Sequence, residues 1–436
     1  MARRIDAVAV LGAGTMGSGI AALCAEAGCR VLLLDVTRDA ADQALARMTT
    51  GRAPLLDDPA SAARIATGSF ETDLARIGDY DWVCEAVIED LATKRALLAQ
   101  IEPLRRAGSV VSSNTSGIPL RAITDGLPER LRQDIAVTHF FNPVKVMKLV
   151  ELVPGAATTP DVLQTFAAFL ADRLGKGVVH AKDTVNFIGN RIGCFWMLSG
   201  LHKAEAALAE GLAMEEIDAL IARPFGIPST GLFGLIDLIG LDVMDLVGKN
   251  LAANLPPGDP GLAYTRLPAA AQAMLERAQL GRKTGGGFYR LLQRDDGTRA
   301  KETFDLVIGS WRPSRTVELD ARHQDAASLI SGTDPAGRFA WDLMGGTLCY
   351  AADLLPAIAD DIVSIDRAMR SGFNWSKGPF ELLDALGPSR VALRLKAEGR
   401  RQPQMLEVLA RSGAERFYRA DGREALGLDG AFRAVS

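Results

Sequence analysis

The sequence predicts an α/β fold with a doubly wound sheet, followed by two duplicated all-α domains. Two observations lead to this prediction. Over roughly the first third of the chain, short apolar runs alternate with segments of helical spacing, a pattern typical of parallel sheets with connecting helices. Further along, in a helical region rich in alanine and leucine, residues 217–240 are repeated with small changes at residues 365–387.

Composition narrows the class of protein. The 436 residues are 48% hydrophobic and 23% charged, which predicts a globular protein with more than one core. The 49 basic residues face 53 acidic ones, so no basic excess favours nucleic acid or an anionic membrane surface. The five cysteines are scattered and form no paired motif, so we expect no metal site and a reducing, cytoplasmic location. We also expect no signal peptide and no membrane-spanning segment.

A glycine-rich turn follows the first predicted strand, residues 5–11, and precedes a segment of helical spacing. The turn has the form GxGxxG. Its first glycine permits the tight turn, the second lets a pyrophosphate approach, and the third packs the helix against the strand. The helix N-terminus then offers free N–H groups to the phosphates. We therefore predict a Rossmann-type dinucleotide site that includes Gly12, Gly14, Thr15, Met16 and Gly17.

An acidic residue ends the second predicted strand at the distance that a dinucleotide fold requires. Asp35 follows the apolar run 31–34 and is placed to bind the adenosine ribose hydroxyls. A carboxylate there would repel a 2′-phosphate, so the pattern favours NAD. Arg38, three residues later, keeps NADP open as an alternative.

Three further strands are predicted at residues 81–87, 109–113 and 135–141, with a helix over 93–101 between the first two. Ligands of doubly wound sheets bind at the carboxyl ends of the strands. Four polar residues fall at or just beyond these ends, and we expect them at one rim of the sheet: Glu89, Asn114, Ser116 and His139.

A histidine and a glutamate are the candidates for acid–base chemistry. His139 stands near the end of a predicted strand, and Glu151 lies in the apolar run 149–153. A carboxylate between aliphatic side chains is costly to bury without a partner, and an imidazole is a suitable one. The alternative is that Glu151 points outward from a half-exposed strand and that His139 is an ordinary rim residue. The spacing of the two residues does not separate these interpretations.

Six segments resemble the 3-hydroxyacyl-CoA dehydrogenase family, in order and at matching intervals. They are GAGTMGSGIA, EAVIEDLATK, SSNTSGIPL, THFFNPVKVMKLVELV, KDTVNFIGNRIG and GRKTGGGFY. The resemblance covers most of the chain and is weakest after residue 290. It implies NAD-dependent oxidation of a (3S)-3-hydroxyacyl-CoA to a 3-oxoacyl-CoA in fatty-acid β-oxidation.

The resemblance also implies roles for particular residues. His139 corresponds to the catalytic base and Glu151 to the carboxylate that orients it, which suits a proton transfer near neutral pH. Ser116 and Asn190 correspond to residues that hold the substrate oxygen and the histidine. The cofactor site is completed by two positions that contact the nicotinamide half and by the rim asparagine: Glu89, Lys94 and Asn114.

The repeat predicts the domain organisation. We expect an NAD-binding domain at 1–182, a first helical copy at 183–290, a linker with turns at 291–337 and a second copy at 338–436. In single-copy members of the family this helical domain forms the homodimer interface. We therefore expect the second copy to take the partner's place, leaving the chain monomeric with one active site.

The tandem copies resemble the dehydrogenase part of multifunctional fatty-acid oxidation proteins. No segment here resembles a hydratase, so we expect either a fragment or a free-standing relative, with an enoyl-CoA hydratase outside this chain. The substrate partner expected is an acyl-CoA. Two alternatives remain: a related dehydrogenase of a non-CoA hydroxy acid or sugar acid, and a catalytically idle structural relative.

Overall fold

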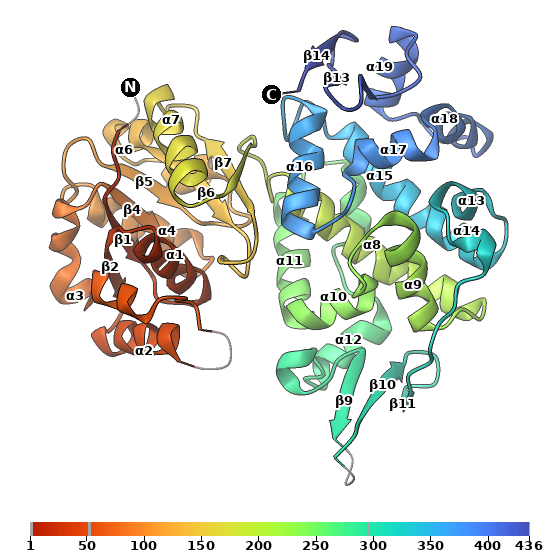
Figure 1. Cartoon of the computed structure of the whole chain (residues 1–436), viewed down its shortest axis with the longest axis horizontal. Helices are drawn as coiled ribbons and strands as arrows, with labels where there is room; N and C mark the ends of the chain where they lie inside the picture. The colour runs from red at the N-terminus through yellow and green to blue at the C-terminus, as the bar shows by residue number, and fades with distance from the viewer. Residues whose placement is uncertain (1–2, 51–53, 294–296, 436) are drawn as a thin grey trace. The chain divides into compact units, whose positions relative to one another are not determined.

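The computed structural model describes residues 3–50, 54–293 and 297–435. The chain divides into two compact units (Figure 1). The first comprises Met1–Ile188 with Ala357–Ala359, and the second comprises Gly189–Pro356 with Asp360–Ser436.

The first unit is built on an eight-stranded sheet, and the predicted doubly wound α/β fold is confirmed. Neighbouring strands are parallel except for one antiparallel pair, β6 and β7. From one edge to the other the strands are β3 (Ile65–Ser69), β2 (Arg30–Asp35), β1 (Ala7–Leu11), β4 (Trp82–Glu85), β5 (Val110–Ser113), β6 (Ile135–Phe140), β7 (Leu149–Pro154) and β8 (Gly177–His180).

Helices connect the parallel strands of this unit (Figure 1). They are α1 (Thr15–Glu26), α2 (Arg38–Thr49), α3 (Phe70–Asp73), α4 (Leu91–Ile101), α5 (Leu120–Thr124), α6 (Glu129–Asp134) and α7 (Pro160–Ala168). Three of them begin at capping side chains that satisfy a free N–H group of the first turn. Thr37 caps α2, Ser69 caps α3, and Asp90 accepts from the Thr93 N–H of α4 at 2.8 Å.

The antiparallel pair interrupts an otherwise parallel sheet. Only residues 141–148 connect β6 to β7, whereas a parallel connection needs a crossover of about a dozen residues or more. The chain therefore turns back beside β6. This turn places the end of β6 directly opposite β7, which positions the candidate catalytic pair.

The second unit is mainly helical. Its first part contains α8 (Gly189–Ala209), α9 (Met214–Phe225), α10 (Gly231–Ile239), α11 (Leu241–Asn254) and α12 (Ala269–Glu276). Its later part contains α13 (Ala326–Ser331), α14 (Pro335–Ala340), α15 (Gly346–Asp353), α16 (Ile362–Phe373), α17 (Pro379–Leu386), α18 (Pro388–Ala397) and α19 (Gln404–Ser412), followed by a three-stranded sheet, β12 (Tyr418–Arg419), β13 (Glu424–Leu426) and β14 (Phe432–Ala434).

The two helical copies repeat the same buried hydrogen bonds. Asp218 of α9 accepts from the Tyr289 hydroxyl at 2.8 Å, and Asp366 of α16 accepts from the Tyr418 hydroxyl at 2.8 Å. In each copy a phenylalanine N–H also donates to this aspartate at 2.8 Å. Burial raises the pKa of Asp218 to about 7 and that of Asp366 to about 8, although the hydrogen bonds act in the opposite direction. The repeat seen in the sequence is therefore also a repeat of structure.

The segment between the copies contains more regular structure than a linker with turns. An antiparallel sheet forms from β9 (Tyr289–Gln293), β10 (Arg299–Asp305) and β11 (Ser310–Pro313), and it projects from the helices of this unit (Figure 1). Residues 294–296 of the predicted linker lie outside the described residues. The strands are short and mostly polar, so neither an apolar run nor strict alternation marks them in the sequence.

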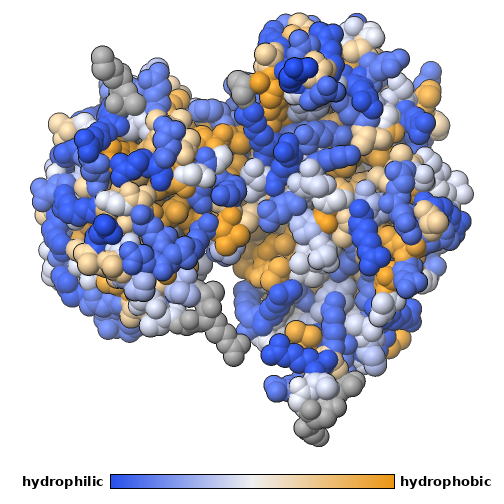
Figure 2. Space-filling view, viewed as in Figure 1, coloured by the Kyte–Doolittle hydropathy of each residue, from blue (hydrophilic) through white to orange (hydrophobic). Residues whose placement is uncertain are grey.

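The surface of each unit is mainly hydrophilic on the face drawn in Figure 2, with apolar side chains showing between polar ones. Within the described ranges, none of the helices combines the length and the apolar character needed to cross a lipid bilayer.

Candidate active site

The candidate acid–base pair lies at the end of β6. His139 and Glu151 are direct partners across the antiparallel pair β6–β7, so their side chains point to the same face of the sheet. His139 Nδ1 and Glu151 Oε2 are 2.7 Å apart. The side chains of His139 and Glu151 are 3% and 0% exposed. The half-exposed alternative for Glu151 is therefore wrong, and the two residues form a buried hydrogen-bonded pair.

The second oxygen of Glu151 is held by the backbone. The Ile188 N–H donates to Glu151 Oε1 at 3.0 Å. The two residues before Ile188 both have left-handed conformations, with φ of 61° at Asn186 and 51° at Phe187. Such conformations are costly for residues with side chains and are frequent at functional sites. Both carboxylate oxygens of Glu151 thus have a donor, which fixes its orientation.

Aromatic rings enclose the imidazole. The ring centres of His139 and Phe141 are 4.5 Å apart, and those of His139 and Phe187 are 5.6 Å apart. These contacts keep the imidazole in one rotamer beside Glu151. They also reduce the water around it, which strengthens its electrostatic interaction with the carboxylate.

The glycine-rich turn has the geometry expected for a dinucleotide site. Gly12 has φ of 108°, a conformation open mainly to glycine. A Cβ atom at Gly17 would lie 1.8 Å from the Gly12 carbonyl oxygen, so the third glycine is required by close packing. A Cβ atom at Gly14 would meet no protein atom within 4 Å, so this face of the turn is open to a ligand.

Helix α1 begins at this turn without a side-chain cap. Thr15 is exposed and Met16 is half-buried in the first turn of the helix. The N–H groups of a helix N-terminus bind phosphate oxygens and carry partial positive charge. The residues here therefore fit the pyrophosphate of a dinucleotide.

The environment of Asp35 favours NAD. Its Oδ2 accepts from the Ala13 N–H at 2.6 Å, so the carboxylate sits against the glycine-rich turn. Arg38, which could have bound a 2′-phosphate, instead directs its Nη2 to the carboxylate of Asp73 at 2.9 Å. The arginine is therefore already paired, which disfavours NADP.

A buried ion pair lies under the next strand ends. Lys94, on α4, has a side chain that is 1% exposed, and its Nζ is 2.8 Å from Glu85 Oε1 and 3.3 Å from Glu89 Oε2. Glu85 also accepts from the Ser113 hydroxyl at 2.5 Å. The lysine thus lies beneath Glu89, which is the more exposed of the two predicted nicotinamide contacts. Through this contact the ammonium orients Glu89.

Glu89 in turn holds the loop that carries Ser116. Its Oε1 accepts from the Thr115 hydroxyl at 2.6 Å and from the N–H groups of Ser116 and Gly117 at 2.9 and 3.0 Å. Burial opposes ionisation of Glu89, but the Lys94 ammonium and these donors outweigh it and lower the pKa. Ser116 is exposed, and its hydroxyl makes no hydrogen bond to a described residue. That hydroxyl is available to a ligand.

The remaining rim residue joins the loop to the catalytic strand. Asn114 Oδ1 accepts from the Phe140 N–H at 3.0 Å, next to His139. The first unit thus contains the whole predicted set except Asn190, which belongs to the second unit, in the first turn of α8. Asn190 follows Ile188, the donor to Glu151, by two positions in the chain.

Several contacts at the site were not predicted from the sequence. These are Glu85 beneath Lys94, the Ile188 N–H on Glu151, and the pairing of Arg38 with Asp73. Glu85 could have been noticed as a charged residue in a strand that is otherwise apolar. The backbone donor could not, because no side chain marks it.

Chemically, the site offers an imidazole held by a carboxylate, a free hydroxyl on the loop that Glu89 holds, and a turn suited to pyrophosphate. A metal site is not apparent: no group of three or more metal-ligating side chains occurs in the described part of the chain. The arrangement suits proton transfer coupled to a dinucleotide.

Comparison with known families agrees with this geometry. Residues 7–184 match the family described as 3-hydroxyacyl-CoA dehydrogenase, NAD binding domain. Residues 187–291 match the 3-hydroxyacyl-CoA dehydrogenase, C-terminal domain. Neither match includes the second helical copy.

Individual relatives extend the comparison. A "Probable 3-hydroxyacyl-CoA dehydrogenase" of Bacillus subtilis (strain 168) is 35% identical over an alignment of 463 positions, covering 100% of this chain and 58% of the relative. A "3-hydroxybutyryl-CoA dehydrogenase" of Mycobacterium tuberculosis is 33% identical, covering 66% of this chain and 99% of the relative. The crystal structure of 3-hydroxybutyryl-CoA dehydrogenase from Escherichia coli K12 aligns with a TM-score of 0.70 and 25% identity, covering 94% of this chain and 100% of that one. The chain thus spans little more than half of the length of the B. subtilis relative.

Proposed function

The chain belongs to the 3-hydroxyacyl-CoA dehydrogenase family, and we propose that it catalyses NAD-dependent oxidation of a (3S)-3-hydroxyacyl-CoA to a 3-oxoacyl-CoA, as in fatty-acid β-oxidation. The observation that carries this proposal is the buried 2.7 Å contact between His139 Nδ1 and Glu151 Oε2. A base held in this way is what the removal of a hydroxyl proton requires.

The contact assigns a role to each ring nitrogen. With Nδ1–H donating to Glu151, the neutral imidazole of His139 keeps its lone pair on Nε2. Nε2 takes the proton of the substrate hydroxyl, and the imidazolium that results is stabilised by the adjacent carboxylate. Bound NAD supplies the hydride acceptor for the hydroxyl-bearing carbon. In the reductive direction His139 returns the proton.

The residues around the pair act on the substrate oxygen and the cofactor. We assign the free hydroxyl of Ser116, together with the amide of Asn190, to the oxygen on which charge changes during the reaction. The glycine-rich turn and Asp35 bind the adenosine half of NAD. Glu89, steadied by Lys94, is assigned to the nicotinamide half.

Replacing His139 tests the role of the base. His139→Gln should lower kcat by several orders of magnitude, while NADH binding, followed by its fluorescence, is retained. His180→Gln is the matched control, because His180 is an exposed histidine on the same sheet. Retention of more than about a tenth of the activity in His139→Gln would contradict the proposal.

The substrate class is tested separately. Rates of NAD reduction are compared between (3S)-3-hydroxybutyryl-CoA, longer hydroxyacyl-CoAs and free 3-hydroxybutyrate. Turnover of the thioesters alone supports the proposal, and turnover of the free acid at an equal kcat/KM assigns the chain to a non-CoA hydroxy acid instead. Tight NADH binding with no turnover of any of them would indicate a catalytically idle relative.

We further propose that the chain is monomeric, and that an enoyl-CoA hydratase, as a partner or as a domain outside these residues, supplies its substrate. Helix α8 of the first copy packs against α14, α15 and α16 as well as α10. Gly193 of α8 faces the Phe373 ring so closely that a Cβ atom would lie 2.0 Å from it. The second copy therefore covers the helix on which a partner would otherwise pack. Light scattering should give the mass of one chain, and an obligate dimer joined through the first copy would refute this.

A further inference from the structure

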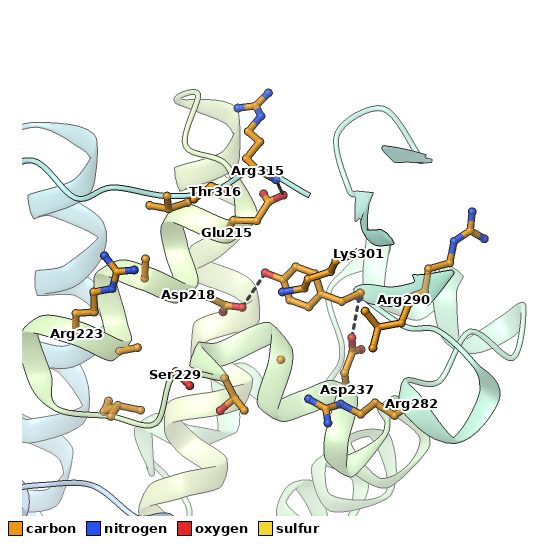
Figure 3. Close-up of a pocket in the computed structure, with 18 of the residues that line it drawn as sticks. Glu215, Asp218, Arg223, Ser229, Asp237, Arg282, Arg290, Lys301, Arg315 and Thr316 are labelled. Atoms are coloured by element: carbon orange, nitrogen blue, oxygen red, sulfur yellow. Dashed lines mark hydrogen bonds between the residues drawn. The ribbon is translucent and has the colours of Figure 1, made fainter. Parts of the chain in front are cut away.

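A pocket of about 770 Å³ lies within the second unit, between the helices of the first copy and the sheet β9–β11 (Figure 3). Pockets of this size accommodate ligands of several hundred cubic ångströms. It lies entirely within the helical unit, and none of the residues assigned above to catalysis or to NAD lines it.

Three cations line the pocket without an ion-pair partner. Arg223 comes from α9, Arg282 from the turn before β9, and Lys301 from β10. None of them forms a salt bridge with a described residue, whereas Arg290 on the same wall is paired with Glu302 at 2.6 Å. Figure 3 shows the side chains of Arg282 and Lys301 directed toward the interior, with Arg290 and Arg315 directed away.

Among the described residues, none of the pocket's carboxylates forms a salt bridge with these three cations, because each holds other groups of the protein. Glu215 is already bonded to Arg312 at 2.7 Å. Asp237 accepts from the Phe288 and Tyr289 N–H groups, both at 2.7 Å. Each of these carboxylates therefore already accepts hydrogen bonds from within the protein, and the three cations keep N–H donors for a ligand.

Partial protonation lowers the negative charge of the pocket at one of its carboxylates, Asp218. Burial raises the pKa of Asp237 to about 6, even though Arg282 and Lys301 act to lower it. Burial likewise raises the pKa of Asp218 to about 7. Near neutral pH Asp218 is therefore partly protonated, whereas Asp237 is mostly ionised.

One of the three cations, Arg223, has no basic counterpart in the second copy. The position of Arg223 in the first copy corresponds to Ser371 in the second, and both helices end in the same left-handed cap, at Gly226 and Asn374. The Lys301 ammonium lies 3.9 Å from the Tyr289 ring centre, a contact that holds it at the pocket wall. The repeat unit folds without an arginine at this place, so its presence calls for another explanation.

We propose that this pocket binds an organic phosphate of nucleotide size. Guanidinium and ammonium groups are the usual phosphate donors, and three of them, from three different elements, line this pocket. The hydroxyls of Ser229 and Thr230 supply further donors at the same wall. The cavity is larger than an inorganic phosphate fills, so the ligand carries an organic part beside its two or more negative charges.

Calorimetric titration of the full chain tests this proposal, with saturating NADH present so that the glycine-rich turn is already occupied. The probes are adenosine 3′,5′-bisphosphate, ATP and inorganic tripolyphosphate. We expect one binding event per chain that weakens as ionic strength rises. A preference for the two nucleotides assigns the site to a nucleotide, whether free or as part of a larger coenzyme, and this is the expected result. Equal binding of tripolyphosphate would overturn the requirement for an organic part.

Variants locate the binding event. Arg223→Gln and Lys301→Gln should each lower affinity about tenfold, since each removes one charge-assisted contact. Lys249→Gln is the matched control, because Lys249 is an exposed lysine of α11 outside the pocket. Failure of every probe to bind at millimolar concentration, or equal binding in all three variants, would overturn the proposal. Because the readout is binding rather than turnover, the result does not depend on the proposed dehydrogenase activity.

Discussion

Glu151→Gln separates the charge of Glu151 from its shape. In the structure the carboxylate shares a hydrogen bond with His139 Nδ1 at 2.7 Å and accepts another from the Ile188 N–H at 3.0 Å. Glutamine has a single acceptor oxygen. One of the two donors must therefore face the amide NH₂, and the negative charge beside the imidazole is lost.

The expected loss of kcat follows from the distance between the imidazolium and carboxylate charges. Charge centres about 4 Å apart interact by about 4 kcal/mol at an effective dielectric constant of about 20. This energy stabilises the imidazolium formed as the substrate proton is removed, and it is not required by the neutral resting state. Since each 1.36 kcal/mol is worth about tenfold in rate, we expect kcat to fall about a thousandfold.

The assay is steady-state oxidation of 3-hydroxybutyryl-CoA at saturating NAD, with NADH affinity measured in parallel. Glu102→Gln is the matched control. Glu102 is also a buried carboxylate of the first unit, 2.5 Å from Arg105, but it follows the C-terminal end of α4, away from the strand ends that carry the site. It should lower the thermal stability and leave kcat within about twofold of the native value.

Two results would show that the charge of Glu151 does not act in the transition state. If Glu151→Gln retains more than about a tenth of the native kcat while folding normally, the carboxylate does not stabilise the charged imidazole. A loss confined to KM would also contradict it, because the interaction is expected only in the transition state.

Three further predictions concern the cofactor and the helical unit. Gly14→Ala should leave the melting temperature unchanged, because the added Cβ meets no protein atom, and should weaken NADH binding, because the Cβ lies on the face of the turn that is open to the ligand. Gly17→Ala should lower the melting temperature, because its Cβ would lie 1.8 Å from a carbonyl oxygen. Asp35→Ser should weaken NADH binding about tenfold or more and reduce the preference for NADH over NADPH, with both affinities measured by fluorescence titration. An unchanged ratio of the two affinities would show that Asp35 does not contact the ribose. Burial raises the folded-state pKa of Asp366 to about 8 from 3.8, so its contribution to stability is complete below about pH 4 and is lost as the pH rises toward 8. Asp366→Asn should therefore flatten the fall in melting temperature across that range in scanning calorimetry, and a slope equal to that of the native chain would contradict the assignment.

Some strands could be predicted from the sequence and others could not. Strands β1, β2, β4, β5 and β6 were predicted because each is an apolar run that ends at a turn or a polar residue. Strand β3 was not, because its residues IATGS include neither an apolar run nor a strict alternation, and it forms only by pairing with β2. The sheet β9–β11 was missed for a similar reason, since its strands are mostly polar in sequence and form by pairing with each other.

By itself the sequence determined the features that depend on local chemistry. The glycine-rich turn, Asp35 after its strand, and the repeated helical segment can each be read from residue type and spacing, because turn conformation and helical periodicity are local properties. The tertiary structure decided what depends on register. Placing Glu151 opposite His139 requires the antiparallel pairing of β6 with β7, and a slip of one residue would turn the carboxylate to the other face of the sheet. The bond from Ile188 and the pairing of Arg38 with Asp73 likewise join groups far apart in the chain, and only folding brings them within hydrogen-bonding distance.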